Sequence, residues 1–315
     1  MVTITTLNAQ KLTEPTAIAL GYFDGVHLGH RLVIKSASEA KARGFKTCVF
    51  SFTVTNANPT SGKGSLNILS GETKAEQMRL MGVDYFIMPD FAELKDLEPA
   101  QFVQLLTERF HAKALYCGGS FRFGRQAAGD VSLLWRLCEA KGVSLTVVPD
   151  MLLEGKPVSS SLIRGHLERG EVEQAARLLG RPYSYCFSVE PGRQLGRKLA
   201  APTINQHFEP HMLVPRYGVY AAFVRLDGAI YPAVTNIGVR PTVDDGIAPV
   251  SETWIIGYNG DLYGKPVQVN LLRYLRDERK FNSVEELRAA IHEDGETVNR
   301  YFDQWLAESV LPDSY

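Results

Sequence analysis

Apolar residues in the first half of the chain are spaced in two ways, and segments of the two kinds alternate along the chain. Continuous apolar runs, typical of buried strands, occupy residues 16–22, 46–52, 83–88, 113–117 and 143–148. Between these runs apolar residues recur at helical spacing, in residues 32–43, 72–80, 99–110 and 130–141. Strands that alternate with helices are typical of a parallel sheet covered by helices. The pattern predicts a doubly wound α/β domain, and we expect its ligands at the carboxyl ends of the strands.

The rhythm changes in the middle of the chain. Two short helices are predicted at residues 160–169 and 172–179, and residues 180–182 (GRP) then break the chain. A length of 315 residues is long for one core and comfortable for two. We place the boundary near residue 184, which divides the chain into two domains, 1–184 and 185–315.

The second half favours β structure as far as Arg276. Asp227-Gly228 is a strong two-residue hairpin signal, and Asn259-Gly260 marks a second turn. This pattern predicts a small antiparallel barrel with Greek-key or meander connections. A capping-box pattern at Ser283 and Glu286 then predicts a terminal helix, because apolar residues follow at helical spacing: Leu287, Ile291, Val298, Phe302 and Trp305.

Composition narrows the class of protein only a little. The net charge of -1 gives no electrostatic reason to expect broad nucleic-acid binding. The N-terminus lacks the pattern of a signal peptide, and no apolar run approaches the length of a membrane span. We expect a cytoplasmic protein whose four scattered cysteines are reduced core residues: Cys48, Cys117, Cys138 and Cys186.

The stretch GYFDGVHLGH, residues 21–30, lies between the first predicted strand and the first predicted helix. Such a turn directs a helix N-terminus outward, where free N–H groups and the helix dipole favour an anion. His27 and His30 lie one turn apart beside it, so nucleotide phosphate is the first expectation. Two alternatives stay open from spacing alone: half of a metal site, for which no third ligand lies nearby, or two surface histidines flanking a turn.

Three motifs of the first half resemble the nucleotidyltransferase module of bacterial bifunctional riboflavin kinase/FAD synthetases. GYFDGVHLGH resembles the family signature G-x-F-D-G-x-H-x-G-H. GGSFRFGRQAAGD, residues 118–130, is similar to the family's glycine-rich loop, and VSSSLIR, residues 158–164, is similar to its S-S-T-x-I-R element. The motifs occur in the family's order and are followed by LLGRPY, residues 178–183. The resemblance implies a Rossmann-like nucleotidyltransferase domain.

The implied reaction is attack of the FMN phosphate on the α-phosphorus of ATP, which gives FAD and pyrophosphate. By the resemblance, His27 and His30 hold the ATP phosphates, and Arg164 closes on them from the other side with a forked, charged donor. Asp24 is expected to brace the turn by accepting backbone hydrogen bonds. The other residues implied in nucleotide or flavin binding are Gly21, Phe23, Gly25, Gly29, Gly118, Phe121, Phe123, Gly124, Ser159, Ser160 and Ser161. The serines also suit a helix N-cap, and both roles can coexist.

The first half departs from the family after its second strand. The family usually has a T-F-x-P-H-P type segment there, which helps to shape the flavin site, whereas this chain has SFTVTN at residues 51–56. Ser120 stands where the glycine-rich loop commonly carries an acid. These departures concern flavin affinity or adenylylation rate more than ATP binding, because the phosphate-facing motifs are intact.

LGRKLAAPTIN, residues 195–205, resembles the riboflavin kinase element G-R-x-L-G-F-P-T-A-N. The resemblance implies that Thr203 and Asn205 bind Mg²⁺ and nucleotide phosphate, while Gly196, Arg197 and Pro202 belong to the same nucleotide element. Read without its neighbours, PTIN is only a proline-led turn with an Asx cap. The family's later motifs follow in order: PRYGVY at 215–220, NIGVRPT at 236–242, ET at 252–253, and LYGK and LRDERKF within 262–281.

By that match Glu252 is the general base that takes the proton of the riboflavin 5′-hydroxyl. An exposed strand glutamate in a surface ion pair is the alternative for Glu252. Arg276 is expected to contribute to flavin or nucleotide binding, since a guanidinium does not give up its proton. This half departs from the family at four positions: Phe187, Ala200, Ala201 and Trp254. We expect kinase activity with altered affinity.

The sequence therefore predicts an enzyme that phosphorylates riboflavin to FMN in its C-terminal barrel and adenylylates FMN to FAD in its N-terminal domain. ATP and Mg²⁺ serve both sites, and the partners are the small molecules riboflavin, FMN and ATP, with no nucleic acid and no membrane. Two alternatives stay open: a kinase with an impaired adenylyltransferase module, and a flavin-binding regulatory protein. The sequence leaves open whether the chain forms a homo-oligomer.

Overall fold

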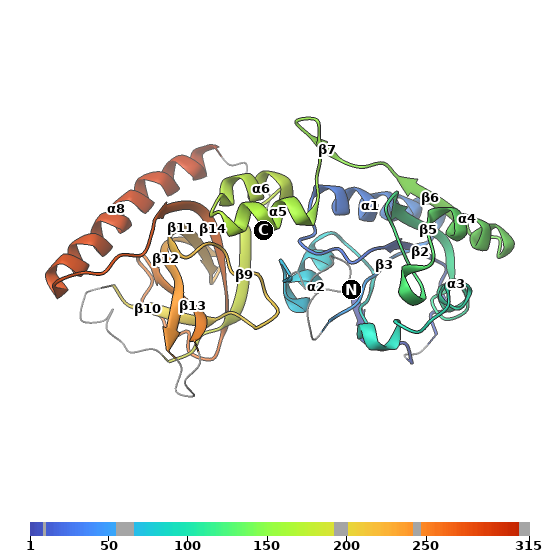
Figure 1. Cartoon of the computed structure of the whole chain (residues 1–315), viewed down its shortest axis with the longest axis horizontal. Helices are drawn as coiled ribbons and strands as arrows, with labels where there is room; N and C mark the ends of the chain where they lie inside the picture. Colours follow the sequence, from blue (N-terminus) through green and yellow to red (C-terminus); the bar gives the residue numbers. More distant parts are fainter. Residues whose placement is uncertain (9–10, 55–65, 192–200, 242–246, 309–315) are drawn as a thin grey trace. The chain divides into compact units, whose positions relative to one another are not determined.

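The computed structural model describes residues 1–8, 11–54, 66–191, 201–241 and 247–308. The chain divides into two compact units: residues 1–67 with 71–160, and residues 68–70 with 161–315. Each unit is built on one six-stranded sheet (Figure 1). Among the described residues, no helix combines the length and the apolar character that a membrane span requires.

The sheet of the first unit is parallel throughout, as predicted. Its spatial order is β1-β4-β3-β2-β5-β6. The strands are β1 (Val2–Ile4), β2 (Thr16–Leu20), β3 (Lys46–Phe50), β4 (Tyr85–Ile87), β5 (Ala112–Gly118) and β6 (Ser144–Val148). The sequence pattern missed β1, which has three residues and is too short for a periodic signal. Between β2 and β5 the strand order reverses, and such a switch point is where doubly wound sheets bind ligands.

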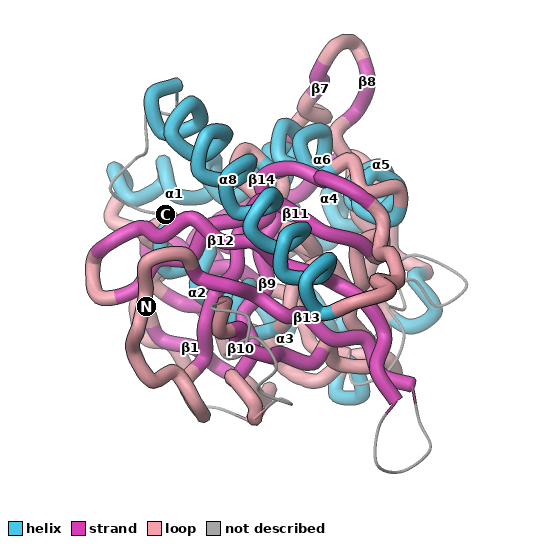
Figure 2. Tube along the Cα trace, turned by 90° about the vertical axis from the view of Figure 1, so that its left-hand side faces the viewer, coloured by secondary structure: helices cyan, strands magenta, loops and turns pink. Residues whose placement is uncertain are grey.

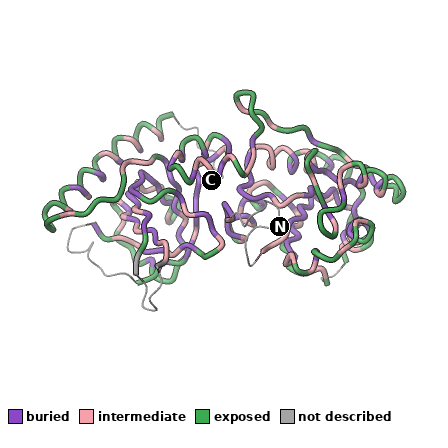
Figure 3. The backbone as a smooth tube through the Cα atoms, viewed as in Figure 1, coloured by how far each residue is buried: buried purple, intermediate pink, exposed green. Residues whose placement is uncertain are grey.

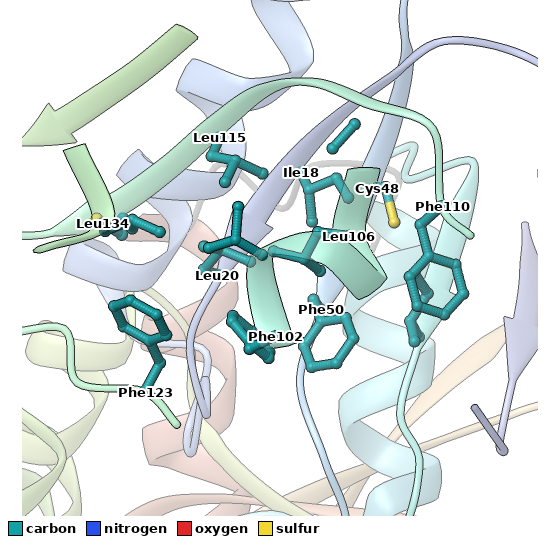
Figure 4. Packing of buried hydrophobic residues seen from close by; sticks show 14 of the residues in the cluster. Ile18, Leu20, Cys48, Phe50, Phe102, Leu106, Phe110, Leu115, Phe123 and Leu134 are labelled. Carbon is teal, nitrogen blue, oxygen red and sulfur yellow. The ribbon is translucent and has the colours of Figure 1, made fainter. Parts of the chain in front are cut away.

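Residues of β2 alternate in size, and this alternation sets the two faces of the sheet. Ile18 and Leu20 belong to a large apolar cluster with residues of two helices, among them Phe102 and Leu106 (Figure 4). The alanines between them point to the opposite face, where α1 packs. The helices of this unit are α1 (Leu28–Ser38), α2 (Gly71–Leu80), α3 (Pro99–Glu108) and α4 (Val131–Ala140), and short 3₁₀ turns lie at Glu39–Arg43, Phe91–Glu93 and Arg125–Ala127.

The second unit holds an antiparallel barrel, as predicted. Its strand order is β10-β13-β12-β11-β14-β9, and a backbone hydrogen bond of 2.9 Å from Glu190 N to Asn205 O links the two edge strands. The strands are β9 (Tyr183–Ser188), β10 (Thr203–His207), β11 (Gly218–Leu226), β12 (Ala229–Pro241), β13 (Ile247–Ile255) and β14 (Pro266–Arg276). Asp227 and Gly228 form the predicted hairpin turn, with φ of 51° and 80°. Asn259 and Gly260 lie in a longer loop between β13 and β14.

The predicted terminal helix is α8 (Val284–Glu308), which packs on β11 and β12 (Figure 2). Ser283 caps it, since its hydroxyl accepts a hydrogen bond of 3.1 Å from Glu286 N. Buried and exposed positions alternate along the helix (Figure 3). Gly295 allows a close approach to the sheet, because a Cβ there would come within 2.6 Å of the Trp254 ring.

The compact units divide between Ser160 and Ser161, whereas the sequence places the domain boundary near residue 184. Two helices separate these positions, α5 (Ser160–Glu168) and α6 (Val172–Leu179), and α6 packs on β9 and β14. Before them the chain forms a small hairpin of β7 (Leu152–Leu153) and β8 (Lys156–Pro157), which the sequence pattern missed.

Four hydroxyl groups form a buried cluster inside the barrel. Tyr185 OH lies 2.5 Å from Ser251 Oγ, and Thr235 Oγ1 lies 3.0 Å from Ser251 Oγ and 2.6 Å from Thr253 Oγ1. Each side chain is almost fully excluded from solvent. Because buried polar groups are costly when unpaired, these hydroxyls satisfy one another and tie β9, β12 and β13 together.

The cysteines bear out the sequence prediction for three positions. Cys48, Cys117 and Cys138 are free and buried, while Cys186 is half-buried. Burial raises the pKa of the Cys117 and Cys138 thiols to about 11 and raises that of Cys48 further. These thiols are therefore protonated packing residues at neutral pH.

Leu106→Ala tests the apolar cluster of the first unit. Leu106 is fully buried there, so the substitution leaves a cavity and should cost about 2–5 kcal/mol of unfolding free energy. Urea unfolding followed by circular dichroism measures it. Leu152→Ala is the matched control, because Leu152 is exposed in the same unit and its loss should have little effect. Equal effects of the two substitutions would contradict this account of the core.

Candidate active sites

The turn after β2 has an unusual backbone. Phe23, Gly25 and Val26 all adopt positive φ, at 55°, 83° and 44°. Phe23 and Val26 are also almost fully buried, and Val26 N donates a hydrogen bond of 3.2 Å to Phe23 O. Residues with a Cβ pay about 1–3 kcal/mol for such conformations, which persist only when the surroundings enforce them. Backbone strain therefore lies at the carboxyl edge of the sheet, where the sequence motif lies.

The two motif histidines meet at the start of α1. His27 is the N-cap, and its Nδ1 accepts a hydrogen bond of 3.3 Å from His30 N. The two rings stack with centroids 3.5 Å apart, and Phe23 meets His30 edge to face. Gly29 leaves room for the His27 ring, since a Cβ at this position would lie 3.2 Å from that ring, a tight contact. The helix begins four residues earlier than predicted because a histidine, rather than a serine or aspartate, caps it.

Electrostatics keep His30 neutral. Burial, the neighbouring His27 and the Lys74 ammonium together hold its pKa well below the usual value of 6.5. Its Nδ1 is buried and has no hydrogen-bond partner among the described residues. A neutral imidazole with one unused ring nitrogen is suited to a hydrogen bond with a ligand. Among the residues that the structure describes, no cluster of three or more histidine, cysteine or carboxylate side chains surrounds a metal position.

Asp24 and the serine motif meet through the backbone. Ser160 Oγ donates a hydrogen bond of 2.8 Å to Asp24 O, which fixes the turn against the start of α5. The Asp24 side chain is buried. Ser159 is half-buried, whereas Ser161 and Arg164 belong to the second compact unit, where Ser161 is exposed and Arg164 buried. Their part in nucleotide binding stays a prediction.

The glycine-rich loop follows β5, which pairs with β2, so both motifs leave the same edge of the sheet. The loop and the start of α4 line an open cavity of about 300 Å³, formed by Gly119, Ser120, Phe121, Arg122, Asp130, Val131 and Ser132. Phe121 and Phe123 stack with ring centroids 5.8 Å apart. Gly118 ends the strand, and Gly124 turns the loop with φ of 74°. Of the four predicted loop residues, Phe121 lines this cavity, Gly118 directly precedes the lining residues, and Phe123 stacks on Phe121.

Part of the segment that departs from the family is described. Ser51 Oγ donates a hydrogen bond of 2.8 Å to Tyr22 O, and the Phe52 ring lies 4.7 Å from the Tyr22 ring. Thr55 and Asn56 lie outside the described residues. The segment therefore packs directly on Tyr22, at the start of the turn that follows β2.

The sequence analysis missed Lys74 of α2. Its Nζ lies 2.9 Å from Tyr22 O and 4.1 Å from the centre of the Tyr22 ring. A single lysine in a polar helix gives no sequence signal, and only the fold shows that the side chain is buried against the motif turn.

In the barrel, strand register brings the predicted kinase residues together. Asn205 of β10 is directly opposite Glu252 of β13, and Glu252 is in turn opposite Asn236 of β12. Residues opposite one another in antiparallel strands share a face, so these three form a row. Thr203 lies on the same face, opposite Trp254. Asn236 stands in the quoted NIGVRPT motif, but the sequence analysis did not single it out, because its position opposite Glu252 is visible only from the register.

The chemistry of this row suits a hard cation. The Asn236 Oδ1 atom is buried without a hydrogen-bond partner among the described residues, while its Nδ2 donates to Glu278 at 2.9 Å. An unpaired amide oxygen is a ligand type that Mg²⁺ accepts, and the Asn205 amide and the Thr203 hydroxyl on the same face are further oxygen donors of this kind. The residues therefore fit the predicted metal.

Arg276 has a protein partner. Its guanidinium donates to both carboxylate oxygens of Asp294 on α8, at 3.1 and 2.7 Å. The pair ties the end of β14 to the helix.

Three other predicted nucleotide residues of this half precede β10. Gly196 and Arg197 lie outside the described residues, and Pro202 is exposed just before β10.

Comparisons with known proteins agree with these two units. A family model described as FAD synthetase matches residues 9–162, and one described as riboflavin kinase matches residues 179–302. A bifunctional riboflavin kinase/FMN adenylyltransferase of Listeria monocytogenes is 32% identical over 291 residues, covering 90% of this chain and 92% of the relative. Relatives with the same name from Pseudomonas fluorescens and Escherichia coli are 34% and 32% identical and cover 87% and 93% of this chain, and 89% and 95% of their own lengths.

The fold of the chain also matches a solved structure over most of its length. A crystal structure described as a macrolide-efflux protein from Streptococcus pneumoniae superposes with a TM-score of 0.81 at 26% identity, covering 95% of this chain and 98% of that chain.

Fold and sites together define a two-domain enzyme that joins an α/β nucleotidyltransferase-type domain to a riboflavin kinase-type barrel. The chain belongs to the bifunctional riboflavin kinase/FMN adenylyltransferase family.

The lowered pKa of His30 predicts a loss of stability in acid. Between pH 6.5 and the lower folded-state pKa, the unfolded chain binds a proton that the folded chain does not, so the unfolding free energy falls as the pH falls. Urea unfolding at several pH values measures the slope, and His30→Gln should reduce it. Nuclear magnetic resonance of the His30 ring should show no titration near pH 6.5. A normal titration there would contradict the buried, neutral ring.

Proposed function

We propose that this chain phosphorylates riboflavin to FMN in its barrel and transfers the adenylyl group of ATP to FMN in its α/β domain. The observation that carries the proposal is that both family models match in one chain, with the two motif histidines stacked in the first unit and the polar row of the kinase motifs assembled in the second. The substrates would be riboflavin, FMN and ATP. Because these are cytoplasmic metabolites, we assign the chain to the cytoplasm.

In the barrel, Glu252 would accept the proton of the riboflavin 5′-hydroxyl as that oxygen attacks the γ-phosphorus of ATP. Its place between Asn205 and Asn236 puts the carboxylate beside the amides that would hold the phosphates and Mg²⁺. Bound Mg²⁺ would neutralise charge on the phosphate oxygens. Thr203, on the same face, would add a hydroxyl to this set, and Arg276 would support the flavin side once Asp294 has oriented it.

In the α/β domain, an FMN phosphate oxygen would attack the α-phosphorus of ATP, and pyrophosphate would leave with the bonding electrons. Positioning and charge neutralisation dominate such transfers, and no covalent protein intermediate is needed. The neutral His30 ring would donate a hydrogen bond to a phosphate oxygen, while the N–H groups at the start of α1 face the anion. Ser159 would join from the part of the VSSSLIR motif that belongs to this unit.

A second candidate is a kinase with an impaired adenylyltransferase. The Ser51-Phe52 segment favours it, because this segment packs on the nucleotide turn and lacks the prolines and the histidine of the family. Purified protein incubated with riboflavin, ATP and Mg²⁺ separates the two. FMN that appears first and FAD that follows would support both activities. FMN that accumulates alone, even after fresh FMN and ATP are added, would establish the second candidate. Saturable flavin binding without ATP consumption would instead indicate a regulatory protein.

Glu252→Ala and His30→Ala should separate the two reactions. Loss of the general base should lower FMN formation by about 10²–10⁴-fold while FMN-to-FAD conversion persists. His30→Ala should do the reverse. Chromatography of both products measures the effects, and Glu209→Ala controls for loss of an exposed carboxylate in the barrel unit. Loss of both reactions in either folded variant would contradict two independent sites.

Asn236→Ala should weaken the dependence of FMN formation on Mg²⁺. Removal of one oxygen donor should raise the Mg²⁺ concentration needed for half-maximal rate by about tenfold, the value of one charge-assisted contact. A magnesium titration of FMN formation measures it. Asn299→Ala, an exposed asparagine on α8, serves as the matched control. An unchanged magnesium curve would exclude Asn236 from the cation site.

A further inference from the structure

Lys74 is buried deeply in the first unit. Its side chain is 3% exposed, and it extends from α2 to the motif turn rather than to solvent. A buried ammonium loses its hydration, and proteins bury lysine rarely unless the charge is paired or used. The position therefore needs an explanation beyond packing.

Among the described residues, the hydrogen bond and the cation–π contact of Lys74 both involve Tyr22, at the entry of the strained turn. Its Nζ donates to Tyr22 O at 2.9 Å and lies over the Tyr22 ring at 4.1 Å, a cation–π arrangement. Tyr22 OH donates to Asn67 at 2.7 Å, which holds the ring in place. The next residue, Phe23, begins the stretch with positive φ. Lys74 thus holds the residue at which the turn enters its strained conformation.

Hydrogen-bond satisfaction alone does not explain the lysine. Tyr22 O already accepts a hydrogen bond of 2.8 Å from Ser51 Oγ. A methionine would fill a similar volume without the cost of burying a charge. What only the lysine supplies is a fixed positive charge behind the turn.

We propose that Lys74 is a positioning residue for adenylyl transfer, which holds the Tyr22–Val26 turn and places a positive charge behind the two histidines that face the ATP phosphates. The charged and titratable groups that interact electrostatically with it are Asp24 of the turn and His30 of α1, and His27 stacks on His30. A cation so placed opposes the negative charge that develops on the leaving pyrophosphate. This inference rests on the proposed adenylyltransferase function.

The pH dependence offers a signature that packing alone would not give. Burial lowers the pKa of Lys74 to about 8, and Asp24 partly opposes the shift. Adenylyl transfer should therefore fall as the pH rises through about 8, where the ammonium is lost. In Lys74→Arg the guanidinium stays charged, so this alkaline loss should disappear.

A rise in pH above 8 should increase the stability of the folded protein while it lowers the rate of adenylyl transfer. Between pH 8 and 10.5 the unfolded chain holds a proton that folded Lys74 has lost, so the wild-type unit becomes more stable as the pH rises. Lys74→Met removes the buried charge and leaves the Ser51 hydrogen bond in place. Its melting temperature at neutral pH should equal or exceed that of the wild type.

The test compares the wild type, Lys74→Met, Lys74→Arg and the control Lys41→Met, a lysine that is largely exposed in the same unit. FMN adenylylation is measured for kcat and for KM of ATP, together with riboflavin phosphorylation and thermal unfolding. Lys74→Met should lower kcat of adenylylation by about 10–100-fold, the cost of a mispositioned reactant. Riboflavin phosphorylation should be unchanged in every variant, and Lys41→Met should match the wild type.

The possible outcomes test the proposed function and the role of Lys74 separately. A wild type that makes no FAD from FMN and ATP overturns the proposed function itself. A wild type that makes FAD, with Lys74→Met equally active, overturns only the role of Lys74. A lower melting temperature with full activity per folded molecule shows a structural lysine and also overturns it. If Lys74→Met does not fold, the alkaline limb of the wild type decides: its absence overturns the proposal.

Discussion

The site of the first unit depends on one constraint, the left-handed turn that follows the central strand β2. Two side-chain-bearing residues, Phe23 and Val26, are held at positive φ, and the conformation persists because neighbouring groups fix its ends. Ser51 and Lys74 bind the carbonyl at its entry, and Ser160 binds the carbonyl of Asp24 within it. The turn in turn sets the start of α1 and the stacking of the histidines. Strain is thus stored where a phosphate would be held.

In the barrel, the pairing register of the strands brings the predicted site residues together. Asn205, Glu252 and Asn236 are far apart in sequence and adjacent in space because β13 pairs with β10 on one side and β12 on the other. The hydroxyl cluster on the opposite face, which includes Ser251 and Thr253, holds the strand that carries Glu252. A slip of one residue would exchange the two faces, so the buried hydroxyls and the polar row enforce each other.

The sequence predicted what depends on local patterns. Alternating strands and helices, the Asp227-Gly228 turn and the Ser283 cap are local features, and the structure contains them. The extra strand β1 and the packing of α6 against the barrel depend on contacts distant in sequence, so no periodicity could reveal them. The same reason hid Lys74 and Asn236, whose settings exist only once helix and strand have packed. The motif resemblance found the other site residues, because it carries information from relatives that a pattern of hydrophobicity lacks.

The intrinsic fluorescence of Trp254 can report on the state of the barrel. It lies two residues from Glu252 on the same face of β13, wedged against Gly295 of α8 and edge to face with His292. An indole in such a tight setting has an emission that depends on small shifts of its neighbours. Movement of α8 or occupation of the polar row would therefore change the fluorescence of this side chain, and ligand binding to the barrel becomes observable without following any product.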